Sequence, residues 1–361
     1  MILELELAAV LTSVPLITAQ SPRALFVVNL DGKSGYMNEM GDIVIRPKFD
    51  GASPFYEGLA RVVFHSPRYS MGYIDESGRL VIPPEFDEAL HFSEGLAEVG
   101  LGEFMLHGGG DHRWGFIDTS GSMVIKPEYR AVRSFKEGLA AVLGDDGRWG
   151  YIDRTGQIAI PFQYDSAGDF SESLARVERE RLFGFVNKRG EVTIPIRFTS
   201  ARGFSEGLAG VRIGGDKVGS GYEPTKIGGR WVYIDKAGET GLPLGSDVIG
   251  VDDFSGGLAA VRIHRSSGNR SGYIDHQGAM VIEPQFTNAE PFSEDLALVR
   301  FEVNGLPHFI DKGGKVVLSL EAFGASSFRN GLAQIERVSS EGTHAFGYID
   351  RTGRVVWPPT R

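Results

Sequence analysis

One short hairpin pattern returns along the chain and restricts its fold more than any other feature. In its clearest copy, Trp149 to Asp153 and Gln157 to Ile160 have the composition of two strands, and Asp-x-x-Gly joins them. Asp suits the first position of a type I turn because its carboxylate accepts hydrogen bonds from backbone N–H groups, and Gly suits the last because it tolerates a positive φ. The pattern therefore predicts a β-hairpin over Gly150 to Pro161 as the structural unit of the chain.

From Arg23 onward the chain divides into nine such units, each predicted as strand, strand, turn and strand. An internal repeat outweighs a domain count based on length, so residues 23–361 are expected to form a single array. Every turn contains both the Asx and the Gly, which assigns these residues a structural role. The turn residues are Asn38 and Gly41, Asp75 and Gly78, Asp118 and Gly121, Asp153 and Gly156, Asn187 and Gly190, Asp235 and Gly238, Asp275 and Gly278, Asp311 and Gly314, and Asp350 and Gly353.

A second recurring segment links the units and has the form Phe-Ser-Glu-Gly-Leu-Ala. Its aromatic residue is expected to form a ladder in the core, because a repeat buries its apolar face against its neighbours. Its Glu recurs with the scaffold, whereas catalytic pairs are normally unique within a chain. The aromatic residues are Phe55, Phe92, Phe135, Phe170, Phe204, Phe254, Phe292 and Phe328, and the glutamates are Glu57, Glu94, Glu137, Glu172, Glu206 and Glu294.

Two insertions, Gly100 to Arg113 and Gly214 to Arg230, interrupt the regular spacing. Both are Gly-rich and polar, and both lie between the Leu-Ala strand and the aromatic-Gly strand of a unit. Because they occupy the same place in the repeat, they should emerge from the same face of the array.

The hairpin resembles that of bacterial WG-repeat proteins. Their hallmark, Trp-Gly-Tyr/Phe-Ile-Asp-x-x-Gly before an apolar strand that ends in Pro, stands here at Trp114 to Asp118 and at Trp149 to Asp153. The resemblance covers nearly everything from about Arg23 to Arg361, and it implies a non-catalytic repeat scaffold of a kind often found in exported or surface proteins. It supplies no catalytic residues. The sequence departs from the hallmark at Ser34, Met71, Phe183, Ser271 and Phe346 in place of Trp, at Val232 and His308 in place of Gly, and at Leu318 to Leu320, which lack the closing Pro.

The units predict an all-β fold, with two possible arrangements. An open, superhelical array of three-stranded repeats is the expected one, because propellers usually hold four to eight blades. Such an array needs protected ends, which Leu3 to Ile17 and Val355 to Pro359 could supply. The alternative is a closed β-propeller, in which the strand Ala24 to Asn29 lies next to the last unit.

Composition excludes several functional classes. The formal charge of −10 argues against nucleic-acid binding, which depends on clustered Lys and Arg. The chain has no Cys, which excludes disulfides, thiolate catalysis, iron–sulfur clusters and Cys-ligated zinc.

Residues 1–22 are interpreted as either a signal peptide or an N-terminal cap. Leu7 to Ala19 resembles the apolar part of an export signal, but Glu4 and Glu6 precede it and no Lys or Arg does. The stretch is too short, and too interrupted by Pro15, for a transmembrane segment. Exported and cytoplasmic locations both stay open.

No motif predicts a catalytic residue, a cofactor or a metal site. The turn carboxylates could be calcium ligands, but Asn38 and Asn187 favour a purely structural turn. His107, Asp111 and His112 are the one local cluster of metal-ligand types, and Gly108 to Gly110 separate them without a further fixed ligand. The Gly-rich stretches contain no phosphate-binding loop, and no Gly-x-Ser-x-Gly elbow is present.

The sequence therefore favours an interaction scaffold that is not an enzyme and that binds an unidentified protein partner. An alternative is a carbohydrate-binding or envelope-associated module, because Trp114, Trp149 and Trp231 could stack on sugars if they were exposed. Their shared place in the repeat makes core packing the expected role. A further alternative, a hydrolase acting in a groove between repeats, would need a His and a carboxylate from different units.

Overall fold

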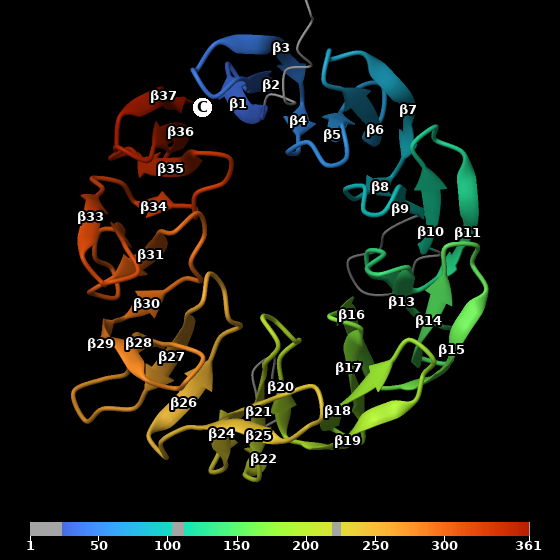
Figure 1. Ribbon diagram of the computed structural model, residues 1–361. Helices are drawn as coiled ribbons and strands as arrows, with labels where there is room; N and C mark the ends of the chain where they lie inside the picture. Colours follow the sequence, from blue (N-terminus) through green and yellow to red (C-terminus); the bar gives the residue numbers. More distant parts are fainter. Residues whose placement is uncertain (1–23, 103–111, 219–224, 361) are drawn as a thin grey trace, which may run out of the picture.

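The computed structural model describes residues 24–102, 112–218 and 225–360, and these residues form a closed ring of nine β-sheets (Figure 1). We number the sheets as blades 1 to 9 in chain order. Blades 2 to 9 each have four antiparallel strands, and blade 1 has three. In Figure 1 the last strand of a blade, such as β11, lies on the outer rim, and the first, such as β8, lies nearer the centre. The described residues include no helix, and therefore none that could span a membrane.

The strands of the first five blades follow one order. Blade 1 contains β1 (Phe26–Leu30), β2 (Lys33–Met37) and β3 (Ile43–Phe49); blade 2 contains β4 (Gly51–Ala52), β5 (Leu59–Phe64), β6 (Ser70–Asp75) and β7 (Leu80–Phe86); blade 3 contains β8 (Glu88–Ala89), β9 (Leu96–Leu101), β10 (Arg113–Asp118) and β11 (Met123–Tyr129); blade 4 contains β12 (Ala131–Val132), β13 (Leu139–Leu143), β14 (Trp149–Asp153) and β15 (Ile158–Tyr164); blade 5 contains β16 (Ser166–Ser171), β17 (Leu174–Arg179), β18 (Leu182–Asn187) and β19 (Val192–Phe198).

The last four blades repeat that order, with one extra hairpin, β22–β23, in blade 6. Blade 6 contains β20 (Ser200–Ala201), β21 (Ala209–Ile213), β24 (Arg230–Ile234) and β25 (Thr240–Pro243), and its hairpin consists of β22 (Asp216–Val218) and β23 (Thr225–Ile227); blade 7 contains β26 (Val248–Val251), β27 (Ala259–Ile263), β28 (Arg270–Ile274) and β29 (Met280–Phe286); blade 8 contains β30 (Asn288–Ala289), β31 (Ala297–Arg300), β32 (His308–Ile310) and β33 (Val316–Ser319); blade 9 contains β34 (Gly324–Ala325), β35 (Leu332–Val338), β36 (His344–Asp350) and β37 (Val355–Thr360).

The prediction of an open superhelical array is wrong, and the alternative of a closed β-propeller is correct. Blade 9 packs directly on blade 1, where Phe26 and Tyr348 meet with ring centres 5.7 Å apart and the Thr360 hydroxyl donates to the carbonyl of Asn29 at 2.5 Å. The segment Val355 to Pro359 therefore lies at a junction between blades and does not cap an open end. The proposed cap over Leu3 to Ile17 and the possible signal peptide lie outside the described residues.

The Asx-x-x-Gly turns form because their side chains and glycines satisfy the backbone locally. In β14–β15, the Gly156 amide donates to the carbonyl of Asp153 at 2.9 Å, and the Asp153 carboxylate accepts from the amides of Thr155 and Gln157 at 2.8 and 3.0 Å. Gly156 has a φ of +85°. Gly150 faces a bulge in β15, and a Cβ there would lie 2.7 Å from the carbonyl oxygen of Ile160. The Gly of the hallmark is therefore required by a close backbone approach.

The hydrophobic core lies between blades. Nine clusters of buried residues are found in the described part of the chain, and each joins two neighbouring blades. The aromatic anchors of the linking segments pack on an aromatic residue of the preceding blade. The pairs, with ring centres 4.6–5.1 Å apart, are Tyr36–Phe55, Tyr73–Phe92, Phe116–Phe135, Tyr151–Phe170, Phe185–Phe204, Tyr233–Phe254, Tyr273–Phe292 and Phe309–Phe328. Since a repeat cannot bury this face alone, each blade is stabilised by its neighbours.

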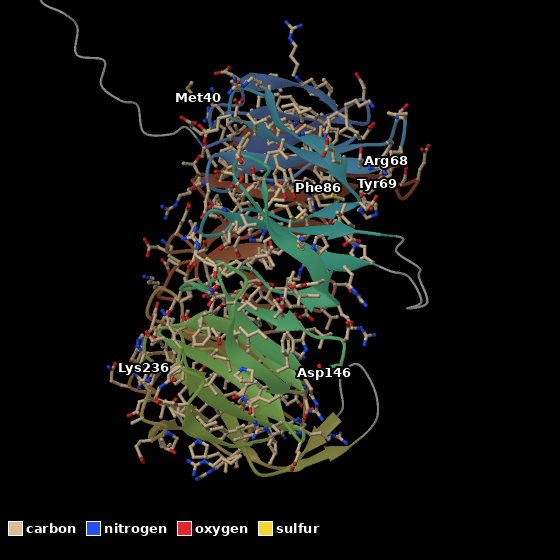
Figure 2. The ribbon with its side chains drawn as sticks, turned by 90° about the vertical axis from the view of Figure 1, so that its right-hand side faces the viewer. Met40, Arg68, Tyr69, Phe86, Asp146 and Lys236 are labelled. Atoms are coloured by element: carbon tan, nitrogen blue, oxygen red, sulfur yellow. The ribbon has the colours of Figure 1, made fainter. Side chains whose placement is uncertain are left out.

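The ring has two distinct faces, which Figure 2 shows edge-on. Met40 and Lys236 belong to Asx-x-x-Gly turns and lie on one face, which we call the turn face. Arg68, Tyr69 and Asp146 lie in loops between the middle two strands of their blades, on the opposite face, which we call the loop face. Both insertions connect the corresponding strands of blades 3 and 6, although residues 103–111 and 219–224 within them lie outside the described residues.

Candidate functional site

A two-residue turn closes the innermost hairpin of each of blades 2 to 9, and we call it the inner turn. Both of its residues have positive φ, as in the type I′ turns favoured by tight hairpins. In Glu94-Gly95 the φ values are +55° and +77°. A left-handed conformation costs a residue other than Gly about 1–2 kcal/mol, so a Glu at this position needs a compensating interaction. The inner turns are Glu57-Gly58, Glu94-Gly95, Glu137-Gly138, Glu172-Ser173, Glu206-Gly207, Gly256-Gly257, Glu294-Asp295 and Asn330-Gly331.

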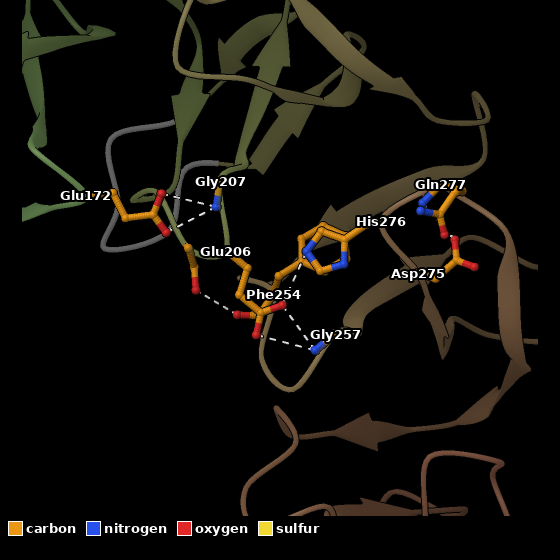
Figure 3. A network of polar contacts seen from close by, with 9 residues as sticks. Glu172, Glu206, Gly207, Phe254, Gly257, Asp275, His276 and Gln277 are labelled. Atoms are coloured by element: carbon orange, nitrogen blue, oxygen red, sulfur yellow. Dashed lines mark hydrogen bonds and ion pairs between the residues drawn. The ribbon is translucent and has the colours of Figure 1, made fainter.

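The compensation comes from the next blade, because each inner-turn glutamate accepts hydrogen bonds from the following inner turn. The Glu57 carboxylate accepts from the amides of Glu94 and Gly95 at 2.7 and 2.8 Å, and the Glu94 carboxylate accepts from the next blade in turn. Figure 3 shows two later steps, from Glu172 to Gly207 and from Glu206 to Gly257. The glutamates therefore link blades in series.

Basic residues of the Asx-x-x-Gly turns reinforce three of these carboxylates. Lys188 lies 3.0 Å from Glu137, Lys236 lies 3.0 Å from Glu172, and His276 lies 3.3 Å from Glu206. Burial acts to raise the pKa of Glu172, but the hydrogen bonds from Lys236 and from the inner turn of blade 6 outweigh it, so the pKa is lowered. Burial also acts to raise the pKa of Glu137, but hydrogen bonds from Lys188 and from the inner turn of blade 5 outweigh it, so that pKa is lowered in the same way. Glu137 and Glu172 are therefore held in the charged form that the junction requires.

Two further hydrogen bonds recur between blades. The first joins a hydroxyl before the inner-turn Glu to the carbonyl of the next aromatic anchor, as from Ser93 to Phe135 at 2.8 Å and from Ser205 to Phe254 at 2.7 Å. The second runs from a buried Tyr hydroxyl to a carbonyl of the next inner hairpin, as from Tyr73 to Leu90 at 2.6 Å. A regular junction thus combines an aromatic pair, a carboxylate and one or two hydroxyl bonds.

At the junction of blades 7 and 8 the carboxylate is missing, because Gly256 stands in place of the glutamate, but the inner hairpin remains. A larger departure from the pattern is found where blade 1 lies between blades 9 and 2. The described residues give blade 1 no short first strand and no inner turn, so β1 pairs with β2 alone. A cavity of about 330 Å³ opens there, lined by residues from all three blades. We call it the seam cavity. Its lining includes Phe26, Phe55, Glu57, Glu76, Arg329 and Tyr348.

Groups that are covered at regular junctions are left uncovered around the seam cavity. Phe55 is only half-buried, whereas the other seven aromatic anchors are 1–3% exposed. Tyr348 retains 9% exposure, whereas the equivalent aromatic residues of the other eight blades are fully buried. Within the described residues, the amides of Glu57 and Gly58 receive no carboxylate, although those of Glu94 and Gly95 do. The cavity therefore offers an apolar wall beside two hydrogen-bond donors.

A stack of three side chains spans the cavity on its inner side. Arg329 of blade 9 donates to the Tyr56 hydroxyl at 2.9 Å, with its guanidinium carbon 4.7 Å from the centre of that ring. Tyr56 in turn stacks on His91 of blade 3 at 4.4 Å. Burial, with smaller contributions from the cations Lys136 and Arg329, lowers the pKa of His91, which favours its neutral imidazole. Arg329 supplies a positive charge near the acids Glu57 and Glu76.

The other residues considered from the sequence do not gather into a reactive centre. His107 and Asp111 lie outside the described residues, and His112 packs edge-on against Trp114 at 5.2 Å. Trp231 is 8% exposed, while Trp114 and Trp149 are half-buried, and Arg133 lies over the Trp149 ring. In the part of the chain that the structure describes, no three His, Cys, Asp or Glu side chains are grouped as metal ligands.

Sequence reasoning missed the seam cavity, although one signal pointed to it. The linking segment occurs eight times for nine units, so the first unit lacks the Phe-Ser-Glu-Gly pattern. This difference in sequence produces a cavity only in the closed ring, where the inner turns of blades 9 and 2 face each other.

A family model described as the WG containing repeat matches six segments of the chain. They are residues 35–64, 71–103, 114–146, 149–180, 183–215 and 272–304, and together they cover more than half of the sequence. No curated protein sequence matches the chain.

Several solved β-structures resemble the ring at low sequence identity. BamB from Moraxella catarrhalis is 12% identical, with 90% of this chain and 95% of that chain covered and a TM-score of 0.39. The β-propeller domain of the Trilobed protease from Pyrococcus furiosus is 10% identical, with 74% and 93% covered and a TM-score of 0.44. AztD from Citrobacter koseri is 11% identical, with 94% and 93% covered and a TM-score of 0.42.

Proposed function

The chain belongs to the WG containing repeat family, and we propose that it is a non-catalytic β-propeller that binds a protein partner through its seam cavity. The observation that carries the proposal is that the described residues leave the inner ring interrupted at blade 1. Every other blade fills the corresponding space with its own inner hairpin, so this space has the shape and chemistry of a piece of polypeptide.

The edge of β1 supports a polypeptide as the ligand. In blades 2 to 9 a short strand pairs with the second strand, as when Ala131 and Val132 pair with Leu143 and Val142. The corresponding edge of β1 has no partner among the described residues. An extended peptide can add to such an edge through main-chain hydrogen bonds, while side-chain pockets provide specificity. A cavity of about 330 Å³ is at the small end of ligand pockets and suits one or two side chains.

Carbohydrate binding is a second candidate, favoured by a different cavity of about 410 Å³ beside blades 6 to 8. Trp231 lies at its edge, and Arg202, Asn269 and Asn288 contribute polar groups to its lining. An indole combines a large apolar face with an N–H donor, and the neighbouring amide and guanidinium groups can hydrogen-bond to sugar hydroxyls. The Trp231 indole N–H already donates to the carbonyl of Ile249 at 3.1 Å, which holds the ring in place.

Selection of peptides from a random phage-displayed library tests the proposal on the full chain. We expect an enriched peptide family whose binding falls at least ten-fold in Phe55→Ala and in Arg329→Ala, and is unchanged in Met40→Asp, an exposed control on the turn face. Circular dichroism checks that each variant is folded. If no peptide is enriched, or if the enriched peptides bind all variants equally, the seam proposal is wrong. Retention of the chain on glycans that is lost in Trp231→Ala would favour the second candidate.

A further inference from the structure

The regular junctions indicate which peptide chemistry the seam cavity accepts. Resting on the function proposed above, we infer that the ligand is an extended peptide that carries an aromatic residue followed two positions later by Glu or Asp. This is the arrangement of Phe92 and Glu94, and it recurs in the inner hairpins of blades 2 to 6 and of blade 8. The ligand would thus supply from another molecule what the described residues of blade 1 do not provide.

The acidic residue follows from the free amides of blade 2. The inner turn Glu57-Gly58 has φ values of +51° and +79°, close to the +55° and +77° of Glu94-Gly95. The latter pair binds the Glu57 carboxylate at 2.7 and 2.8 Å. Two adjacent amides in one rigid turn form an anion-binding concavity. The Glu57-Gly58 turn is therefore already shaped to bind a carboxylate that the described residues do not provide.

The aromatic residue follows from Tyr348. At eight junctions the equivalent ring packs on an aromatic anchor of the next blade, and five Tyr hydroxyls donate to a carbonyl there at 2.6–2.9 Å. Tyr348 instead packs on Phe26 and accepts a hydrogen bond from Gln334 at 3.3 Å. Its ring is partly exposed to the seam cavity and its own hydroxyl proton is available. A bound aromatic side chain and a peptide carbonyl would complete both contacts.

The regular junctions also favour a Ser between the aromatic and the acidic residue of the ligand. Five Ser hydroxyls donate to the carbonyl of the next aromatic anchor at 2.7–2.8 Å, as from Ser93 to Phe135. In the described residues the carbonyl of Phe55 has no such donor. The preferred ligand sequence is therefore Phe-Ser-Glu, with its hydroxyl directed to Phe55.

The chain's own first residues do not carry this chemistry. In the sequence, Ser21 and Arg23 stand four and two residues before Leu25, whereas Phe92 and Glu94 stand four and two residues before Leu96. A partner that provides Phe and Glu at those positions matches the cavity better than this sequence does.

Substitution of Glu76 tests the inference from the protein side. It occupies the place that Lys188 and Lys236 hold in blades 5 and 6, where the Lys pairs with an inner-turn carboxylate. In blade 2 this charge is reversed, which weakens the attraction for an acidic ligand. Replacing Glu76 with Lys should therefore strengthen binding of the carboxylate, because it restores the charge of a regular junction.

The experiment uses a fluorescein-labelled peptide with the sequence of residues 198–211, whose acidic residue is Glu206 alone. Fluorescence anisotropy with the full chain should show saturable binding. We expect the Phe204→Ala peptide to bind at least ten-fold more weakly and the Glu206→Gln peptide at least five-fold more weakly. The Glu76→Lys protein should bind the unmodified peptide three- to ten-fold more tightly and gain little for the Glu206→Gln peptide.

Equal affinity for the unmodified and the Glu206→Gln peptides, or no gain in the Glu76→Lys protein, would overturn the inference. Absence of any binding to the full chain would also overturn it. This holds whichever segment occupies the cavity instead, residues 1–23 or a second copy of the chain. The phage selection separates this failure from that of the proposed function. Enriched peptides that depend on Phe55 but lack the aromatic and acidic pair would leave the function standing and remove the inference.

Discussion

The junction between blades 5 and 6 and the seam around blade 1 are built from the same repeat but differ in the contacts that join neighbouring blades. At the first, Phe204 packs on Phe185 at 4.9 Å, the Glu172 carboxylate accepts from Gly207, and the Ser171 hydroxyl donates to Phe204 (Figure 3 shows the Glu172 contact). At the seam the aromatic pair Tyr36–Phe55 joins blades 1 and 2 at 4.8 Å, but the described residues provide no counterpart of the Glu172 and Ser171 contacts across blade 1. A repeat therefore encodes its own junctions, and the binding site that we propose lies where the described residues of one copy are incomplete.

The seam is nevertheless closed on its outer side, and this explains how the ring tolerates it. Phe26, Val28 and Met37 of blade 1 are buried together with Leu332 and Tyr348 of blade 9. On the inner side Arg329 and Tyr56 join blades 9 and 2 directly. The outer contacts hold the ring together, so its closure does not depend on filling the inner cavity.

The largest expected difference between the two regions comes from removing an aromatic anchor from each. Phe170→Ala should lower the free energy of unfolding by about 3–5 kcal/mol, because it empties a fully packed junction. Phe55→Ala should cost less, about 1–2 kcal/mol, because that ring is only partly buried. Urea unfolding followed by tryptophan fluorescence measures both. Equal losses would mean that the seam is packed like any other junction.

Much of a single blade could be predicted from sequence, because its determinants are local. Asp153 and Gly156 specify a turn within four residues, and the aromatic anchors recur in register with it. The short first strands, such as Ala131–Val132, were missed as strands because two residues carry no periodicity.

Ring closure could not be predicted in the same way. It depends on the angle between neighbouring blades and on contacts such as Phe26 with Tyr348, which join opposite ends of the sequence. The usual number of propeller blades argued for an open array and was misleading. The seam cavity follows from closure, so its residues could not be brought together before the ring was known.

A smaller effect is expected from the series of carboxylates. Glu94→Ala removes hydrogen bonds to the amides of Glu137 and Gly138 at 2.5 and 2.8 Å, and should lower the free energy of unfolding by about 1.5–3 kcal/mol. The matched control is Asn330→Ala at the seam, where the residue has a φ of +51° but no inter-blade carboxylate. The control isolates the cost of placing Ala in a left-handed conformation. If Asn330→Ala lowers the free energy of unfolding as much as Glu94→Ala does, the carboxylate contributes little.

The smallest expected difference is a pH effect confined to the seam. Partial burial first, and then the nearby cations Lys136, Arg329 and Arg61, lower the pKa of His91, while Glu57 acts in the opposite direction. The unfolded chain therefore takes up a proton near pH 6.5 before the native state does, so the contribution of His91 to stability is present above that pH and is lost as the pH falls through the lowered value. Between pH 7.5 and 5.5, the melting temperature of the wild-type chain should fall slightly more than that of His91→Phe, which keeps an aromatic partner for Tyr56 but cannot be protonated. His65→Gln, on the loop face, should follow the wild type. If His91→Phe and the wild type lose the same amount, protonation of His91 does not weaken the stack that spans the seam.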